Sequence, residues 1–203
     1  MGYAMSIVSN VSPLAPKNFP VMHSISGVRF ATANAGIKSG DSEDATLILL
    51  EPETVIAGLF TSSMMKSAPV IDCQNKIGIN VENTGAAIII NSGNANAFTG
   101  RHGELAVREI IAELSTRVQI PVERIFSSST GVIGELLEYQ KIIDVFDHLV
   151  DSLHGSKIEN AARAIMTTDT FPKGSSVKVS SSGGKITISG IAKGSGMIAP
   201  NMG

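Results

Sequence analysis

The sequence is poor in aromatic residues and cysteine, and it contains no tryptophan. Aromatic side chains make up 4% of its 203 residues, so the core must be built from Ile, Val, Leu, Ala and Met. Cys73 is the one cysteine, which excludes an internal disulfide framework and fits a reducing compartment. We expect Cys73 to be a small buried side chain rather than a reactive thiol.

Charge and hydropathy exclude several further classes of protein. The net charge is −2 and the basic residues are dispersed, so we expect no nucleic-acid partner. The sequence has neither a long uninterrupted apolar run nor a basic start followed by an apolar core, so we expect no membrane span and no secretory signal. The four histidines lack metal-ligand spacing, so no metal site is predicted. Residues 1–203 are expected to form one domain in the cytoplasm.

Apolar patterning predicts several strands. Residues 46–50 and 54–61 are apolar runs separated by a Glu-Pro-Glu turn, which predicts a hairpin. Residues 86–91 form a short continuous apolar run, which is typical of a buried strand. Residues 176–180 and 185–191 alternate on either side of a Ser-Gly-Gly turn and predict a second hairpin.

Apolar residues spaced by three and four positions predict three helices. Pro121 blocks continuation of the first helix, and Gly155 is expected to cap the second. The predicted combination of strands and helices indicates an α/β or α+β fold, with helices layered on sheets. The three apolar stripes are Val107, Ile111, Leu114 and Val118; Ile142, Phe146, Leu149 and Leu153; and Ile158, Ala162 and Ile165.

Five short segments stand out because they are rich in small and polar residues. They are GVRFATANAGIK (27–38), NSGNANAFTG (91–100), SSTGVIG (128–134), AIMTTDT (164–170) and AKGSGMIAPNM (192–202). In this order, over nearly the whole chain, they resemble the ornithine acetyltransferase family of arginine biosynthesis. The resemblance implies a layered helix–sheet sandwich of the self-processing ornithine acetyltransferase and aminopeptidase type.

The resemblance also implies a processed enzyme. The precursor would cut its own backbone after Gly203, which leaves this chain as the alpha half and gives a separate beta chain an N-terminal threonine. The α-amine of such a threonine, with a pKa of about 8, can act as the base for its own hydroxyl. The hydroxyl would carry an acetyl group from N-acetylornithine to glutamate by a ping-pong route. No cofactor is implied, although acetyl-CoA is a candidate second donor, and two alpha and two beta chains would form a heterotetramer.

Four residues of this chain match functional positions of the family. The resemblance implies that Thr130 and Gly131 form the oxyanion hole, and that Thr167 and Lys193 bind the substrate, with Lys193 meeting an α-carboxylate. The residue pattern alone favours other interpretations. SSSTG is also typical of an N-cap and tight turn entering a helix at Glu135. Lysines are usually solvated, and threonines near a helix end usually bond to local backbone.

Three asparagines follow the predicted strand at 86–91. Asn91, Asn94 and Asn96 lie in a loop rich in amide side chains. Such a loop could line the active site, but Asn side chains in loops commonly bond to nearby backbone groups. We therefore expect these three residues to satisfy the backbone of their own loop.

Two other functions are compatible with the pattern. A self-processing hydrolase of the aminopeptidase kind would share the threonine nucleophile and pass the acyl group to water. A non-catalytic binding module would place Gly93, Gly131 and Gly196 in anion-cradling loops, although none of them belongs to a phosphate-loop or dinucleotide motif. Hydrolysis without glutamate would favour the first alternative, and phosphate or nucleotide binding would favour the second.

Overall fold

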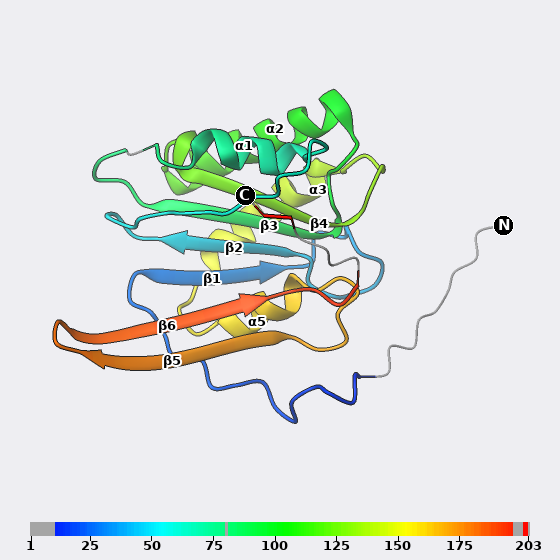
Figure 1. Ribbon diagram of the computed structural model, residues 1–203. Coiled ribbons are helices and arrows are strands. Elements are labelled where there is room, and N and C mark those ends of the chain that lie inside the picture. Colours follow the sequence, from blue (N-terminus) through cyan, green and yellow to red (C-terminus); the bar gives the residue numbers. More distant parts are fainter. Residues whose placement is uncertain (1–10, 80, 197–200, 203) are drawn as a thin grey trace.

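A mixed four-stranded sheet forms the centre of the molecule (Figure 1). The computed structural model describes residues 11–79, 81–196, 201 and 202. The sheet has the order β1-β2-β3-β4, in which β1 and β3 both run antiparallel to β2, and β4 runs parallel to β3. Its strands are β1 (Val28–Ala33), β2 (Ala45–Leu50), β3 (Ala86–Asn94) and β4 (Ile125–Val132).

Helices and a separate hairpin complete the architecture of the described residues. The hairpin pairs β5 (Lys173–Ser181) with β6 (Gly184–Ala192). Helices α1 and α2 pack on β4, while α5 contacts β1, β2 and the hairpin. These layers confirm the expected arrangement of helices on sheets. The helices are α1 (Ala68–Lys76), α2 (Gly100–Val118), a 3-10 turn (Val122–Arg124), α3 (Tyr139–Asp144), α4 (Phe146–Asp151) and α5 (Ile158–Ala164).

The two faces of the sheet pack against different elements. On one face, Leu47 of β2 and its neighbours meet Leu114 of α2 and Phe146 of α4, and all three side chains are fully buried. Because side chains alternate along a strand, Phe30 and Ile48 point to the opposite face. There a smaller cluster forms with Ile158 and Ala161 of α5 and Ile191 of β6. The end of α5 and the end of β6 are thereby brought to the same side of the sheet.

Most of the expected elements are confirmed, and β3 is longer than the predicted strand because it runs on to Asn94. The first and third helices and the second hairpin form where their patterns predict them. Cys73 is buried, as expected, and its Sγ lies 3.2 Å from the Ser127 carbonyl. Burial raises the pKa of this thiol, so it is a packing residue rather than a nucleophile.

The expected strand at residues 54–61 is wrong. β2 already pairs with β1 on one edge and with β3 on the other, so the sheet offers no position for a hairpin partner beside it. Val55 and Leu59 are 89% and 79% exposed, which shows that this apolar run is not part of the core.

The second expected helix is divided in two. Helices α3 and α4 meet at Val145, whose φ of −97° and ψ of 2° interrupt the helical geometry. Helix α4 ends at Asp151, and Ser152 is its C-cap residue. Leu153 therefore lies beyond the helix, and the expected cap at Gly155 is wrong.

Candidate active site

Thr130 and Gly131 lie near the end of β4. The parallel pairing with β3 sets Thr130 opposite Ser92 and Gly131 opposite Gly93, and a bulge follows at Asn94. The interpretation of SSSTG as a helix cap is wrong, since these residues are in a strand and the next helix begins only at Tyr139. A bulge re-aims the side chains around it, and bulges are common beside active sites.

Gly131 is required by the close approach of two backbones. Its φ is +140°, and a Cβ at this position would lie 2.2 Å from the carbonyl carbon of Gly93 and 2.5 Å from the nitrogen of Asn94. No L side chain fits at these distances. The same close approach sets Gly131 directly against Gly93 and leaves no room for a side chain between β3 and β4.

Amide side chains hold the bulge in place. Asn91 donates from Nδ2 to the Asn94 carbonyl at 2.9 Å and accepts from Ser129 Oγ at 2.6 Å. Asn94 accepts from the Asn96 N–H at 2.7 Å and donates to the Glu135 carbonyl at 3.1 Å. These asparagines bond to nearby backbone as expected, but Asn91 and Asn94 lie within β3 rather than in a loop, and their effect is to fix the strand end that carries Thr130.

Three of the predicted site residues come together around one ammonium group. Lys193 Nζ lies 2.8 Å from Thr130 Oγ1 and 3.0 Å from Thr167 Oγ1. Thr130 lies near the end of β4, Thr167 follows α5 and Lys193 follows β6, so three distant segments supply the cluster. The interpretation of Lys193 as a freely solvated lysine is wrong. The predicted cleavage position, Gly203, lies outside the described residues.

Asp169 was not predicted, yet it holds this cluster together. Its side chain is fully buried and accepts hydrogen bonds from the N–H of Gly194 (2.6 Å), the N–H of Thr167 (3.2 Å) and Lys173 Nζ (2.6 Å). Burial by itself raises the pKa of this carboxyl group, but the hydrogen bonds from Lys173, Gly194 and Thr167 outweigh it and leave the pKa lowered. A sequence signal was present, because Asp169 is the one acidic residue between Glu159 and the last residue of the sequence.

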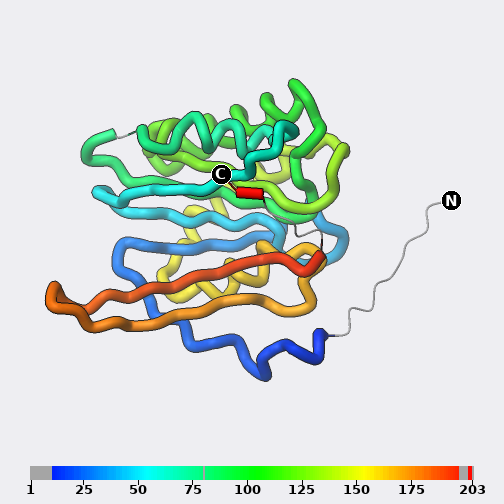
Figure 2. Tube along the Cα trace, in the orientation of Figure 1, coloured from blue at the N-terminus to red at the C-terminus, as the bar shows by residue number. Residues whose placement is uncertain are grey.

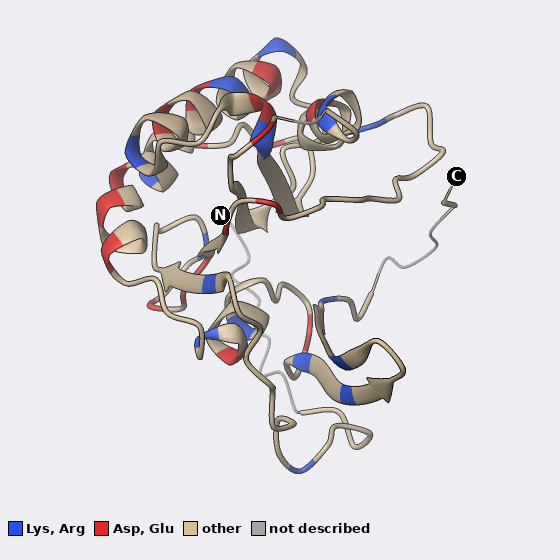
Figure 3. Cartoon of the chain, turned by 90° about the vertical axis from the view of Figure 1, so that its left-hand side faces the viewer, with Lys and Arg blue, Asp and Glu red and all other residues tan. Residues whose placement is uncertain are grey.

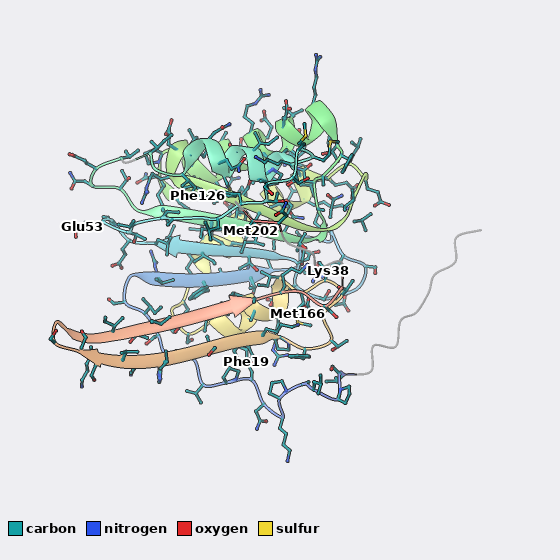
Figure 4. The ribbon with its side chains drawn as sticks, viewed as in Figure 1. Phe19, Lys38, Glu53, Phe126, Met166 and Met202 are labelled. Atoms are coloured by element: carbon teal, nitrogen blue, oxygen red, sulfur yellow. The ribbon has the colours of Figure 1, made fainter. Side chains whose placement is uncertain are left out.

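Lys38 supports the same cluster from the other side. Its Nζ donates to the carbonyls of Met166 (3.0 Å) and Ala164 (3.3 Å), at the end of α5, and Figure 4 shows Lys38 and Met166 close together. Burial lowers the pKa of Lys38, and the nearby Asp44 carboxylate partly opposes that shift. The residue immediately before Thr167 is therefore anchored by a cation, while Thr167 itself is anchored by Asp169.

A protein-family model described as the ArgJ family matches residues 29–203. The chain belongs to the ArgJ family. It is 48% identical over 198 residues to the arginine biosynthesis bifunctional protein ArgJ of Ruegeria pomeroyi, covering 98% of this chain and 48% of that protein. The protein of the same name from Bartonella henselae is 43% identical, with 95% and 46% covered. The chain thus spans about half the length of the curated relatives it matches.

Two solved structures share the fold of this ArgJ-family chain. The ArgJ crystal structure from Bacillus halodurans superposes with a TM-score of 0.80 at 31% identity, covering 88% of this chain and 92% of that one. The Mycobacterium tuberculosis ornithine acetyltransferase, complexed with ornithine, gives 0.79 at 33% identity, with 88% and 93% covered. The family and the fold type that the sequence motifs imply are therefore confirmed.

Charge is distributed unevenly over this ArgJ-family chain. Figure 3 shows acidic and basic residues mixed along the helices, whereas the hairpin of β5 and β6 carries only basic ones. Among residues 11–79, 81–196, 201 and 202, no group of three or more His, Cys, Asp or Glu side chains could hold a metal ion. Within the same residues, no helix combines the length and the apolar character needed to cross a membrane.

The buried carboxylate predicts a specific pH dependence of stability. We expect Asp169→Asn in the full-length protein to lower the free energy of unfolding at pH 7 by about 1–3 kcal/mol. The reason is that a neutral amide would replace the carboxylate that accepts hydrogen bonds from Lys173, Gly194 and Thr167. Since the folded-state pKa of Asp169 is lowered, this stabilisation is complete above the unfolded-state pKa of about 3.9 and is lost as the pH falls through the folded-state pKa. Urea unfolding at pH 7, 5, 4 and 3 measures the difference between wild type and variant.

The exposed Asp151 provides the matched control for that experiment. Asp151→Asn is expected to change stability by less than about 0.5 kcal/mol at each pH. The account is contradicted if wild type and Asp169→Asn differ in free energy of unfolding by the same amount from pH 7 to pH 3. That result would show that the carboxylate charge of Asp169 is not what stabilises the cluster.

Proposed function

We propose that the complete protein transfers an acetyl group from N-acetylornithine to glutamate, and that this chain supplies the oxyanion-stabilising part of its active site. The convergence of Thr130, Thr167 and Lys193 at the end of β4 carries the proposal. The names of the relatives add support, because they refer to arginine biosynthesis and to an ornithine acetyltransferase with bound ornithine. Those names favour transfer to an amino acid over the hydrolytic alternative.

The attacking group is proposed to be the N-terminal threonine of a beta chain that follows this one in the precursor. Its hydroxyl loses a proton to its own α-amine and attacks the acetyl carbonyl, whose oxygen becomes negatively charged. In the proposed site, the hydroxyl of Thr130 and the backbone N–H of Gly131 donate to that oxygen. Such donors act strongly because they are already in place before the charge develops.

Acyl exchange in two steps accounts for the rest of the proposed reaction. The protonated α-amine gives its proton to the departing nitrogen, so collapse of the first intermediate releases ornithine as an amine and leaves the acetyl group as an ester on the threonine. The amine of glutamate then attacks that ester through a second oxyanion held in the same place. No ATP or other cofactor is required, because the ester keeps the acyl group activated, and acetyl-CoA remains a candidate alternative donor. The ammonium of Lys193 is proposed to meet the α-carboxylate of either amino acid.

An uncovered apolar face supports the proposed beta-chain partner. The register sets Val177 opposite Ile188 and Val179 opposite Ile186, so the four side chains share one face of the hairpin. They are between 43% and 57% exposed in this chain alone. A two-stranded hairpin with a bare apolar face is only marginally stable in water. We propose that the beta chain covers it and that two such alpha–beta pairs form a heterotetramer.

The proposed oxyanion role predicts the effect of Thr130→Ala. Loss of one oxyanion donor is expected to lower kcat for acetyl transfer by about 100- to 1,000-fold, with a much smaller change in KM, because the donor acts mainly in the transition state. Steady-state kinetics with N-acetylornithine and glutamate measures both constants. Thr116→Ala, at an exposed position on α2, is the control and should leave them unchanged. An unaltered kcat for Thr130→Ala would remove Thr130 from the site.

The proposed processing predicts the size of the mature chains. Denaturing mass spectrometry of the full-length gene product is expected to show two polypeptides, the first ending at Gly203 and the second beginning with threonine. The covalent cut is needed because only a free α-amine can serve as the base for the threonine hydroxyl. An uncut polypeptide with full acetyl-transfer activity would contradict this mechanism.

A further inference from the structure

The hydrogen bond between Lys193 and Thr130 has only one direction. An ammonium group has three N–H donors and no acceptor. In the 2.8 Å contact, Thr130 Oγ1 must therefore accept, and in the 3.0 Å contact Thr167 Oγ1 must accept as well. Since the hydrogen of the Thr130 hydroxyl cannot point toward Lys193, it must be donated elsewhere.

The surroundings of Thr130 restrict where that hydrogen can go. Among the residues that the structure describes, Lys193 is the one hydrogen-bond partner of Thr130 Oγ1. Thr130 is half-buried, and Gly131, the next residue, is exposed. The hydroxyl is therefore only partly covered by the chain, and the residue that follows it, which carries the proposed second oxyanion donor, is open to solvent.

We propose that Lys193 is a positioning residue for Thr130, a role that rests on the proposed acetyl transfer. Its ammonium occupies a lone pair of the Thr130 hydroxyl and thereby turns the hydroxyl hydrogen toward the reacting carbonyl oxygen. A hydroxyl that accepts from a cation is also a stronger donor, since hydrogen bonds in a chain polarise one another. Two of the three N–H groups of Lys193 serve the threonines, and the third is left for a substrate carboxylate.

Asp169 fixes Lys193 in the position that this role requires. It accepts from the N–H of Gly194, the residue directly after Lys193, at 2.6 Å, and from the N–H of Thr167 at 3.2 Å. Gly194 has a φ of +147°, a turn geometry that favours glycine. One buried carboxylate therefore fixes the backbone at two places. One is Gly194, directly after Lys193, and the other is Thr167, whose hydroxyl the ammonium contacts. The orientation of the Thr130 hydroxyl depends on a chain of contacts from Asp169 through Lys193.

A double-mutant cycle of Lys193→Met and Thr130→Ala in the full-length processed enzyme tests this role. The readouts are kcat and the KM of each substrate, measured by varying N-acetylornithine at saturating glutamate and glutamate at saturating N-acetylornithine. We expect Lys193→Met to lower kcat by about 10-fold or more, a part of the roughly 100- to 1,000-fold effect of losing the whole donor. The double variant should be hardly slower than Thr130→Ala, because Lys193 has nothing to orient once the hydroxyl is absent.

A different outcome would overturn the proposal. If Lys193 only binds the substrate carboxylate, Lys193→Met raises KM without lowering kcat, and its effect multiplies with that of Thr130→Ala. That result refutes the positioning role while acetyl transfer by the wild-type enzyme still stands. Absence of acetyl transfer by the processed wild-type enzyme would instead refute the proposed function.

Three further variants separate orientation from general structural damage. Thr130→Ser keeps the hydroxyl and should remain sensitive to Lys193→Met. Asp169→Asn should lower kcat when Thr130 is present and have little further effect on Thr130→Ala. Lys185→Met, at an exposed position near the start of β6, should leave kcat unchanged. Where Lys193→Met prevents processing, Lys193→Gln replaces it in the same cycle and is expected to lower kcat in the same direction.

Discussion

The hydrogen bonds from the Lys193 ammonium to two threonine hydroxyls join segments that are 63 and 26 residues apart in the chain. The rest of the site depends on this contact. Lys193 can reach both hydroxyls only because β6 ends on the same side of the sheet as the end of α5. That placement follows in turn from the small apolar cluster in which Phe30, Ile158 and Ile191 pack together. Packing on one face of the sheet therefore determines the chemistry at its edge.

A half-buried cation and a buried carboxylate hold this geometry on two sides. Lys38 donates to carbonyl groups at the end of α5, and Asp169 accepts from the backbone N–H groups of Thr167 and of Gly194, the residue after Lys193. Burying a charge is costly unless it is paired or hydrogen-bonded, and here each charge has several partners. A site held in this way keeps its donors in place before a substrate binds, which is the condition for effective oxyanion stabilisation.

Local patterns predicted the elements that local residues determine. The apolar stripe ending at Val118 predicted α2, and the alternation around Ile186 and Ile188 predicted the hairpin. The pairing of β1 with β2 was missed, because the Glu-Pro-Glu turn suggested a local hairpin and nothing in residues 54–61 shows that the sheet edge is already occupied. Strand partners are a long-range choice that periodicity does not encode.

The site was predicted by resemblance and not by pattern. Thr130, Thr167 and Lys193 each have an ordinary local explanation, and their proximity is visible only in three dimensions. Asp169 and Lys38 were missed because a single charged residue in a polar segment usually lies in solvent. The C-terminal residues are also placed by a distant partner, since Met202 pairs with Thr61 and the Asn201 carbonyl accepts from the Ser62 N–H at 2.7 Å. Figure 2 shows this C-terminal segment beside the cyan part of the chain, and Met202 is labelled in Figure 4.

The central claim is that the hydroxyl of Thr130 and the N–H of Gly131 bind the oxygen of the acyl group during transfer. A crystal structure of the full-length processed enzyme trapped with its threonine acetylated measures this directly. The account predicts that the acetyl carbonyl oxygen lies about 2.7–3.1 Å from Thr130 Oγ1 and from the Gly131 nitrogen, while Lys193 still contacts Thr130. An acetyl oxygen bound by other groups, with Thr130 out of hydrogen-bonding reach, would contradict it.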